Sequence, residues 1–236
     1  MAVPGLKSIF DIAQHQTNCD FRAAKSAGLE AVIIKATQGV NFVDPQFRNH
    51  LAGAQAAGLM IGAYHFGTAS DAVGQADDFL KAVNPGPDTL LALDYEENPS
   101  GTQMTIPIAE KFVARVHEKT GRFPVFYCGH LFKEQMGNAK HPLFAQCPLW
   151  LAAYVRDPAP FVQKTWVDWT LWQHTNGTDG PEAVPVAGVG ACDRSTFKGT
   201  PADLRAIWKS GLVAPEPAGA AERDPNRASS QPRASS

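Results

Sequence analysis

The chain has 236 residues, of which 44% are hydrophobic and 19% charged, a normal composition for a globular protein. Its formal net charge of -2 argues against a basic surface for nucleic acid or for an anionic membrane. No apolar run reaches the ~18–20 residues that a membrane-spanning helix needs. The N-terminus, MAVPGLKSIFDIAQ, lacks a long apolar segment, so no secretory signal is expected.

Strands and helices are predicted to alternate along the chain. The expected strands are short, largely apolar runs at 8–13, 31–36, 60–66, 89–95, 124–128, 149–154, 169–174 and 190–194. Helical patterns that stop before glycine or proline lie between the early strands, at 20–27, 45–57, 70–83 and 105–119. After Cys128 the helical patterns become short or disappear.

This order of elements predicts an α/β fold. Repeated strand, helix and glycine segments favour right-handed βαβ units. Eight strands in this length indicate an irregular (β/α) barrel, similar to a TIM barrel, with a degenerate second half. An open doubly wound sheet is the alternative, but no G-x-G-x-x-G follows the first strand. Residues 1–212 are predicted to form the barrel, and 213–236, which lack large apolar residues, a disordered tail.

The four cysteines point to neither a zinc site nor a dithiol redox site. Cys19, Cys128, Cys147 and Cys192 are scattered, and none belongs to a C-x-x-C motif. Free, mostly buried thiols are expected. A Cys128–Cys192 bridge is the alternative.

Two acids close the strand expected at 89–95, in the run Leu-Leu-Ala-Leu-Asp-Tyr-Glu-Glu. Side chains at i and i+2 of a strand share a face, so Asp94 and Glu96 point together while Tyr95 points away. Two adjacent carboxyl groups cannot both ionise freely, so one pKa should rise. A proton donor beside a carboxylate is the equipment of glycoside hydrolysis. A solvated loop after a buried strand is the plainer interpretation of such a motif taken alone.

Two further acids are expected at the same end of the barrel. Asp11 lies near the end of the first strand and Asp193 in the last. The first and eighth strands of a closed barrel are neighbours, and active sites lie at the C-terminal ends of the strands. Four carboxyl groups should therefore face one mouth. A cluster of acids without compensating charges lowers the stability of a protein, so it usually marks a functional site. Hard cations also bind carboxylates, but no second D-x-D motif or histidine pair supports a metal site, and none is expected.

Aromatic and polar side chains near strand ends suit a sugar-binding groove, because aromatic faces stack on sugar rings. The candidates for substrate binding are Tyr64, His65, Tyr127, Trp150, Tyr154 and Gln173. Core packing is the alternative for Trp150, and a structural role for His65. Lys35 is a charge inside an apolar strand and needs a carboxylate partner, either Asp11 or another mouth acid. It is the seventh candidate.

Taken together, these residues resemble glycoside hydrolase family 25, the muramidases also called Chalaropsis-type lysozymes. The resemblance covers residues 9–197 and rests on seven motifs in compatible order. These are Phe-Asp-Ile-Ala-Gln-His-Gln at 10–16, Val-Ile-Ile-Lys-Ala-Thr-Gln-Gly at 32–39, Ile-Gly-Ala-Tyr-His-Phe at 61–66, Leu-Asp-Tyr-Glu at 93–96, Leu-Trp-Leu-Ala-Ala-Tyr at 149–154, Trp-Thr-Leu-Trp-Gln-His-Thr at 169–175 and Cys-Asp-Arg-Ser-Thr-Phe at 192–197.

The resemblance implies an irregular barrel of eight strands and about five helices. It also implies cleavage, with retention, of the β-1,4 bond between N-acetylmuramic acid and N-acetylglucosamine in bacterial peptidoglycan. Glu96 matches the general acid. Asp94 matches the carboxylate that attacks the anomeric carbon or steadies an intermediate formed by the substrate's N-acetyl group, and Asp11 and Asp193 match two further acids. A monomer without a cofactor, acting on the cell wall after cytoplasmic synthesis, is expected.

The chain departs from the family pattern at three places. Phe-Asp-Ile-Ala stands where Gly-Ile-Asp-Val-Ser is common, Gln38 where glutamate is common, and Tyr95 where an aliphatic residue is usual. These changes affect the expected substrate preference more than the chemistry. Two other functions stay open. A chitinase-like hydrolase also ends a strand in D-x-E, though usually after the longer run D-x-x-D-x-D-x-E, and a non-catalytic barrel would only bind glycan.

Overall fold

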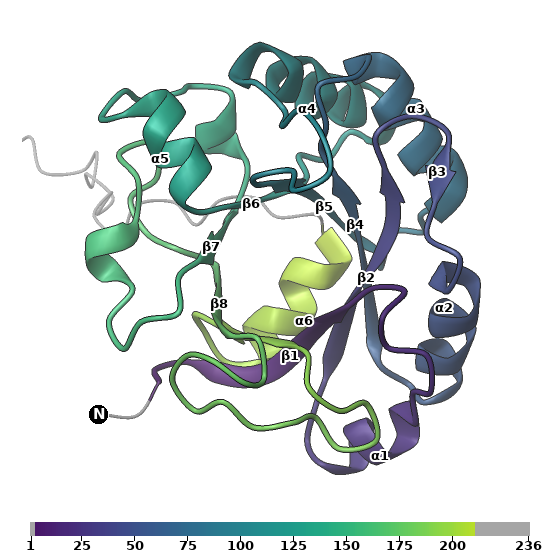
Figure 1. Ribbon diagram of the computed structural model, residues 1–236. Coiled ribbons are helices and arrows are strands. Elements are labelled where there is room, and N and C mark those ends of the chain that lie inside the picture. Colours follow the sequence, from purple (N-terminus) through teal and green to yellow (C-terminus); the bar gives the residue numbers. More distant parts are fainter. Residues whose placement is uncertain (1–2, 211–236) are drawn as a thin grey trace, which may run out of the picture.

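A closed ring of eight strands forms the centre of the computed structural model, which describes residues 3–210 (Figure 1). The ring closes because β1 pairs with both β9 and β2, while β3 (Phe42–Val43) only extends β2 outside it. The ring strands are β1 (Leu6–Ile12), β2 (Ala31–Gln38), β4 (Met60–Phe66), β5 (Leu90–Tyr95), β6 (Val125–Cys128), β7 (Leu149–Ala152), β8 (Leu171–Thr175) and β9 (Asp193–Phe197). The predicted barrel is confirmed.

The helices are concentrated in the first half of the chain, as expected. They are α1 (Phe21–Ser26), α2 (Phe47–Ala56), α3 (Ala72–Val83), α4 (Ile106–Thr120), the short α5 (His130–Met136) and α6 (Pro201–Ser210), with 3₁₀ turns at Phe144–Gln146 and Ala159–Phe161. Figure 1 shows α1 to α5 outside the ring of strands, and α6 is seen behind the opening of the ring. Local sequence sets their starts: the side chain of Asp20 accepts hydrogen bonds from the first turn of α1, and that of Asp71 from α3.

The last strand differs from the prediction in position and direction. It was expected at 190–194 but runs from Asp193 to Phe197, antiparallel to both β1 and β8. The reason for the shift is a tight turn, in which Val186 pairs with Gly190 while Gly188 and Gly190 adopt positive φ. The connection at 176–192 contains no helix, and β9 runs back along β8 in the antiparallel direction.

Strict alternation of side chains separates two apolar layers. One layer fills the inside of the barrel, and its buried residues are Ile9, Ala31, Ile33, Leu90, Ala92, Val125, Tyr127, Trp150, Leu171, Phe197, Leu204 and Trp208. The other lies between the strands and the surrounding helices and includes Phe10, Leu93, Phe112 and Trp172. Neighbouring residues of each strand therefore belong to different layers.

Helix α6 closes the end of the barrel opposite the mouth. It follows β9, whose final residue Phe197 pairs with Leu6 at the start of β1. Its residues Leu204 and Trp208 belong to the interior layer, and the Trp208 indole N–H donates to the Ile61 carbonyl at 2.8 Å. The predicted domain boundary after residue 212 and the predicted tail at 213–236 lie outside the described residues.

All four cysteines are free, and Cys128, Cys147 and Cys192 are buried. The expectation of free thiols is confirmed, and the alternative Cys128–Cys192 bridge is absent. Across residues 3–210, no helix combines the length and apolar character needed to cross a bilayer.

Replacing Trp208 should destabilise the whole barrel, because the indole is 2% exposed and fills the interior from below. For Trp208→Ala we expect a loss of about 3–5 kcal/mol in the free energy of unfolding, the usual range for a buried tryptophan. Urea denaturation followed by circular dichroism measures it. Phe161→Ala, at a side chain that is 43% exposed, is the matched control. Equal stability of the two variants would contradict the role of α6 as a closing element.

Candidate active site

The mouth of the barrel is lined by the last inward-facing residue of most strands. Inside the barrel the lower positions are apolar, for example Ile9 on β1 and Ala92 on β5. Two residues further along each strand the same face carries Asp11 and Asp94. The equivalent positions on the other strands are Lys35 on β2, Tyr64 on β4, Tyr127 on β6, Gln173 on β8 and, on the antiparallel β9, Asp193.

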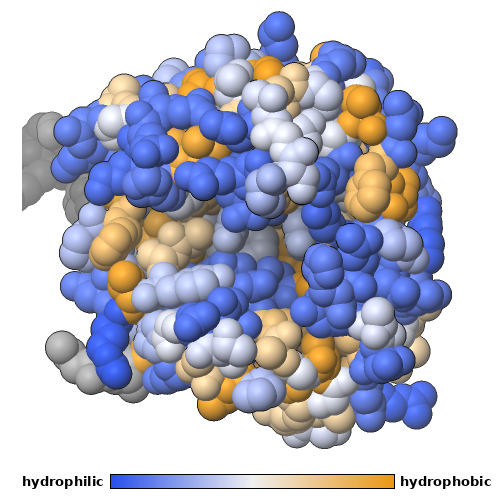
Figure 2. Space-filling model, in the orientation of Figure 1, coloured by the Kyte–Doolittle hydropathy of each residue, from blue (hydrophilic) through white to orange (hydrophobic). Residues whose placement is uncertain are grey.

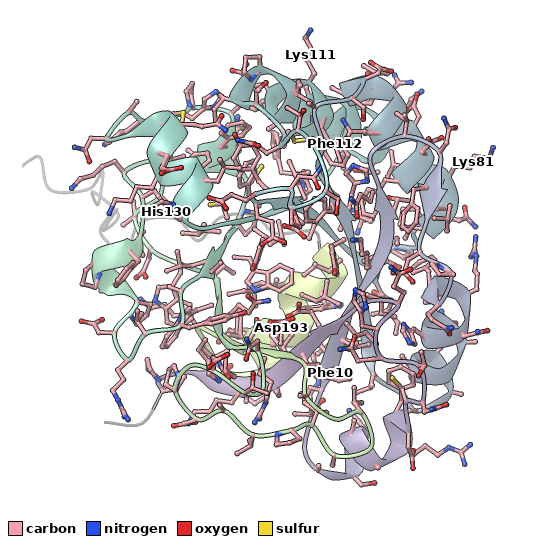
Figure 3. All side chains as sticks on the ribbon, in the orientation of Figure 1. Phe10, Lys81, Lys111, Phe112, His130 and Asp193 are labelled. Atoms are coloured by element: carbon pink, nitrogen blue, oxygen red, sulfur yellow. The ribbon has the colours of Figure 1, made fainter. Side chains whose placement is uncertain are left out.

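The residues at these mouth positions, except Lys35, line a pocket of about 210 Å³. It is lined by Asp11, Tyr64, Asp94, Glu96, Tyr127, Trp150, Tyr154, Gln173 and Asp193. Figure 2 shows a hollow near the centre of this face, and Figure 3 shows Asp193 inside the ring of strands. All four predicted catalytic acids and five of the predicted substrate-binding residues therefore meet at one place. Asp11 and Asp193 are direct cross-strand partners, as the neighbouring first and last strands predicted.

Asp94 is the most unusual of the four acids. Its side chain is buried, and its Oδ1 atom has no hydrogen-bond partner. Burial raises the pKa of Asp94 well above its usual range, and the nearby charge of Glu96 raises it further. A buried carboxyl oxygen without a partner is costly in a resting protein. Asp94 nevertheless lines the pocket, so its carboxyl group is close to any ligand bound there.

Glu96 has the pKa expected of a proton donor. Burial, followed by the charge of Asp193 and, to a smaller extent, that of Glu97, raises its pKa to about 7. The charge of Lys35 lowers the pKa of Glu96 and also that of Asp94. The two carboxyl groups therefore titrate as a unit that holds a proton near neutral pH. Glu96 is the less buried of the two and lies just beyond the end of β5, where a bound molecule can reach it.

Lys35 is near the acids, but it does not form the direct carboxylate pair that was expected. Its ammonium group donates to the side-chain oxygen of Gln38 at 2.7 Å and lies 4.7 Å from the centre of the Phe66 ring. Asp94 and Glu96 act on it through space. Gln38 was not among the predicted site residues. A shift in the β2–β4 register between Lys35 and Thr37 interrupts the regular pairing there, and sequence alternation alone does not reveal such a shift.

The structure corrects the placement of His65, which does not reach the pocket. Tyr64 and His65 are adjacent on β4, so only one of them can face inward. Tyr64 does, whereas His65 is fully buried behind the strand, where it bonds to Thr37 and Gln75 and stacks on Phe112. Burial lowers its pKa to about 4, so it is a neutral structural histidine.

Trp150 reaches the pocket only as part of its wall. Its side chain is 2% exposed, and its indole N–H donates to the Ser195 hydroxyl at 2.9 Å. Tyr154 is 41% exposed and remains available to a ligand. The core-packing alternative for Trp150 is therefore the better description, although its edge lines the pocket.

Residues with metal-ligand character gather elsewhere. Glu97, His130 and Glu134 each place one ligand atom within 4.8 Å of the others, and all three are exposed. Figure 3 shows His130 on α5, away from Asp193. Its ring pairs with Glu134 at 3.6 Å, as expected for surface groups one helical turn apart.

The raised pKa of Glu96 predicts a stability change in Glu96→Gln. An acid whose pKa rises on folding, here from 4.5 to about 7, contributes full stability below pH 4.5 and loses it as the pH rises to 7. Glutamine cannot ionise, so we expect Glu96→Gln to be more stable than the wild type by about 2–3 kcal/mol at about pH 8, but not at about pH 4. Urea denaturation at both pH values measures the difference. Glu118→Gln, at an exposed glutamate, is the control, and an equal effect of both variants at about pH 8 would contradict the shift.

The chain is similar in sequence to a known family and to known proteins. A family model described as glycosyl hydrolases family 25 matches residues 10–182. Lysozyme M1 of Streptomyces globisporus is 34% identical over 217 residues, which is 84% of this chain and 69% of that protein. The N,O-diacetylmuramidase of Chalaropsis sp is 30% identical over 71% of this chain and 87% of its own length.

Two solved structures have the same fold. The bacterial lysozyme from Streptomyces coelicolor superposes with a TM-score of 0.77 at 30% identity, covering 89% of this chain and 99% of its own. A family GH25 lysozyme from Aspergillus fumigatus gives a TM-score of 0.73 at 35% identity, with coverages of 86% and 98%. The region matched by the family model, residues 10–182, includes Asp11, Asp94 and Glu96. The chain belongs to glycosyl hydrolase family 25.

Proposed function

We propose that the protein is a peptidoglycan hydrolase, an N-acetylmuramidase that cleaves the β-1,4 bond between N-acetylmuramic acid and N-acetylglucosamine. The observation that carries the proposal is the pair formed by Glu96, whose pKa rises to about 7, and the buried Asp94 in one mouth pocket. Two carboxyl groups with different environments are what glycoside hydrolysis requires. Membership of family 25 and the similarity to lysozymes and a muramidase support the substrate class.

In the proposed mechanism Glu96 donates its proton to the leaving glycosidic oxygen. Positive charge then develops at the anomeric carbon, and Asp94 either attacks that carbon or steadies an intermediate formed by the substrate's own N-acetyl group. Both routes give retention of configuration. Asp11 and Asp193 add negative charge around the developing cation. Tyr64 and the exposed Tyr154 are the proposed glycan contacts.

The remaining parts of the proposal concern assembly and place of action. The substrate lies in the bacterial cell wall, so the enzyme acts outside the cytoplasmic membrane, in an extracellular or periplasmic space. We propose that it works as a monomer without a cofactor, because one chain supplies every residue of the pocket. Light scattering of the purified protein tests the monomer.

Digestion of purified peptidoglycan is the experiment that tests the activity. Mass spectrometry of borohydride-reduced products should identify new reducing ends at muramic acid. Cleavage of chitin oligomers alone would support a chitinase-like enzyme. Binding to peptidoglycan without any product would support a non-catalytic barrel.

Removing either central carboxyl group should abolish most of the turnover. We expect Glu96→Gln to lower kcat by about 10²–10⁴, the usual contribution of a general acid. Asp94→Asn should lose a similar factor, because the developing positive charge loses its nearby anion. Release of reducing ends from soluble wall fragments measures both. Circular dichroism should show native folding, and a folded Glu96→Gln variant with near wild-type turnover would refute its assignment.

Glu97 offers a way to shift the pKa of Glu96 without touching the pocket. Its charge raises that pKa, so Glu97→Gln should lower it and move the alkaline limb of kcat/KM to lower pH. The shift should shrink at high salt, because charges near the surface are screened. Glu118→Gln is the control, since Glu118 pairs with Arg115 on α4. An alkaline limb that stays in place in Glu97→Gln would mean that another group controls it.

A further inference from the structure

Gln173 has every polar atom engaged with the protein. Its side chain is 3% exposed. Its amide N–H group donates to both carboxyl oxygens of Asp11, at 3.1 and 3.2 Å. Its carbonyl oxygen accepts from the hydroxyl of Tyr127 at 2.8 Å and from that of Tyr154 at 3.3 Å. Such an amide has little capacity left for a sugar hydroxyl.

The surrounding partners fix which way the amide points. A flipped amide would turn its carbonyl oxygen toward the Asp11 carboxylate and its N–H group toward two hydroxyl groups. The single O–H group of Tyr154 is shared between Asp193, at 2.9 Å, and the carbonyl oxygen of Gln173, at 3.3 Å. The network therefore joins the two cross-strand acids Asp11 and Asp193 through one tyrosine and one amide. The correct orientation therefore places a donor at Asp11, where a carboxylate needs one.

Asp11 depends on this donor because other influences oppose its charge. Burial raises the pKa of Asp11, the charges of Asp193 and Glu96 raise it further, and the hydrogen bond from Gln173 lowers it. The other titratable groups coupled to Asp11 are Asp94, Tyr64, Tyr127, Tyr154 and Cys192. Each of these is an acid, so none brings a positive charge that would stabilise the ionised form.

We propose that Gln173 is a positioning residue, whose amide favours the ionised form of the Asp11 carboxyl group and aims it at the pocket, rather than a direct contact of the glycan. This inference deepens the proposed function and rests on it. With the amide in place, Asp11 presents negative charge toward the site where positive charge develops. Without it, Asp11 takes up a proton or rotates away, and the transition state loses part of that charge.

Gln173→Glu and Gln173→Met separate this role from packing. A protonated glutamate has the shape of glutamine, with an O–H group that donates to Asp11 and a carbonyl that accepts from the tyrosines. An ionised glutamate repels Asp11. We therefore expect Gln173→Glu to lower kcat by about 10- to 100-fold at about pH 8, the scale of a lost hydrogen bond to a charged group, and to recover toward the wild type at about pH 5.

Gln173→Met has no donor at any pH, so its deficit in kcat should not recover as the pH falls. KM for a soluble glycan should stay near the wild-type value in both variants, because the residue acts through Asp11. Gln75→Glu is the matched control, since Gln75 is equally buried but bonds to His65 and Thr68 outside the pocket. Circular dichroism at each pH confirms the fold.

Carbon NMR titration of the Asp11 carboxyl group provides a readout that does not depend on activity. The pKa of Asp11 should be higher in Gln173→Met than in the wild type. An unchanged Asp11 pKa, or equal deficits of Gln173→Glu at both pH values, would overturn the positioning role. A rise in KM with unchanged kcat would instead make Gln173 a glycan contact. A wild-type enzyme that releases no reducing ends would refute the proposed function while leaving the NMR test intact.

Discussion

Asp11, Asp94, Glu96 and Asp193 place four carboxyl groups around a pocket of about 210 Å³, and they cannot all be ionised without strong mutual repulsion. The pKa of each of the four is raised, with burial as the first cause. Protons must therefore remain in the cluster at pH values where isolated carboxyl groups have lost them. A retained proton of this kind is what the site can donate to a bound molecule.

The rest of the fold serves to keep this cluster together and poorly hydrated. The antiparallel pairing of β9 with β1 sets Asp193 directly opposite Asp11. Beneath the acids, the apolar interior residues and the closing indole of Trp208 fill the barrel. This apolar interior lowers the local dielectric constant, and a lower dielectric constant strengthens the interactions between the charges of the site. The barrel thus maintains an arrangement that lowers its own stability at neutral pH.

Much of this site could be predicted from strand alternation, and the errors show where that rule ends. Asp94 and Glu96 share a face because a strand alternates, and the same rule excludes His65 once Tyr64 faces inward. The direction of β9 could not be predicted, because the connections before β8 and β9 both lack an α-helix, yet β8 is parallel to β7 and β9 is antiparallel to β8. The Lys35–Gln38 bond depends on a shift in register. Trp150 is buried in the apolar layer inside the barrel, where its indole bonds to Ser195, a residue far away in the sequence.

The choice of neutral partners explains how the acids keep their protons. Arginine or lysine beside each carboxyl group would lower its pKa and leave no proton to donate. The pocket instead contains the hydroxyl groups of Tyr64, Tyr127 and Tyr154, whose pKa values are all raised, so that they stay neutral. Tyr154 donates to Asp193 and the amide of Gln173 donates to Asp11, and neither donor adds positive charge. Lys35 moderates Asp94 and Glu96 from a position where its own hydrogen bond goes to Gln38. Neutral donors thus orient Asp11 and Asp193, while burial and mutual repulsion keep the cluster partly protonated.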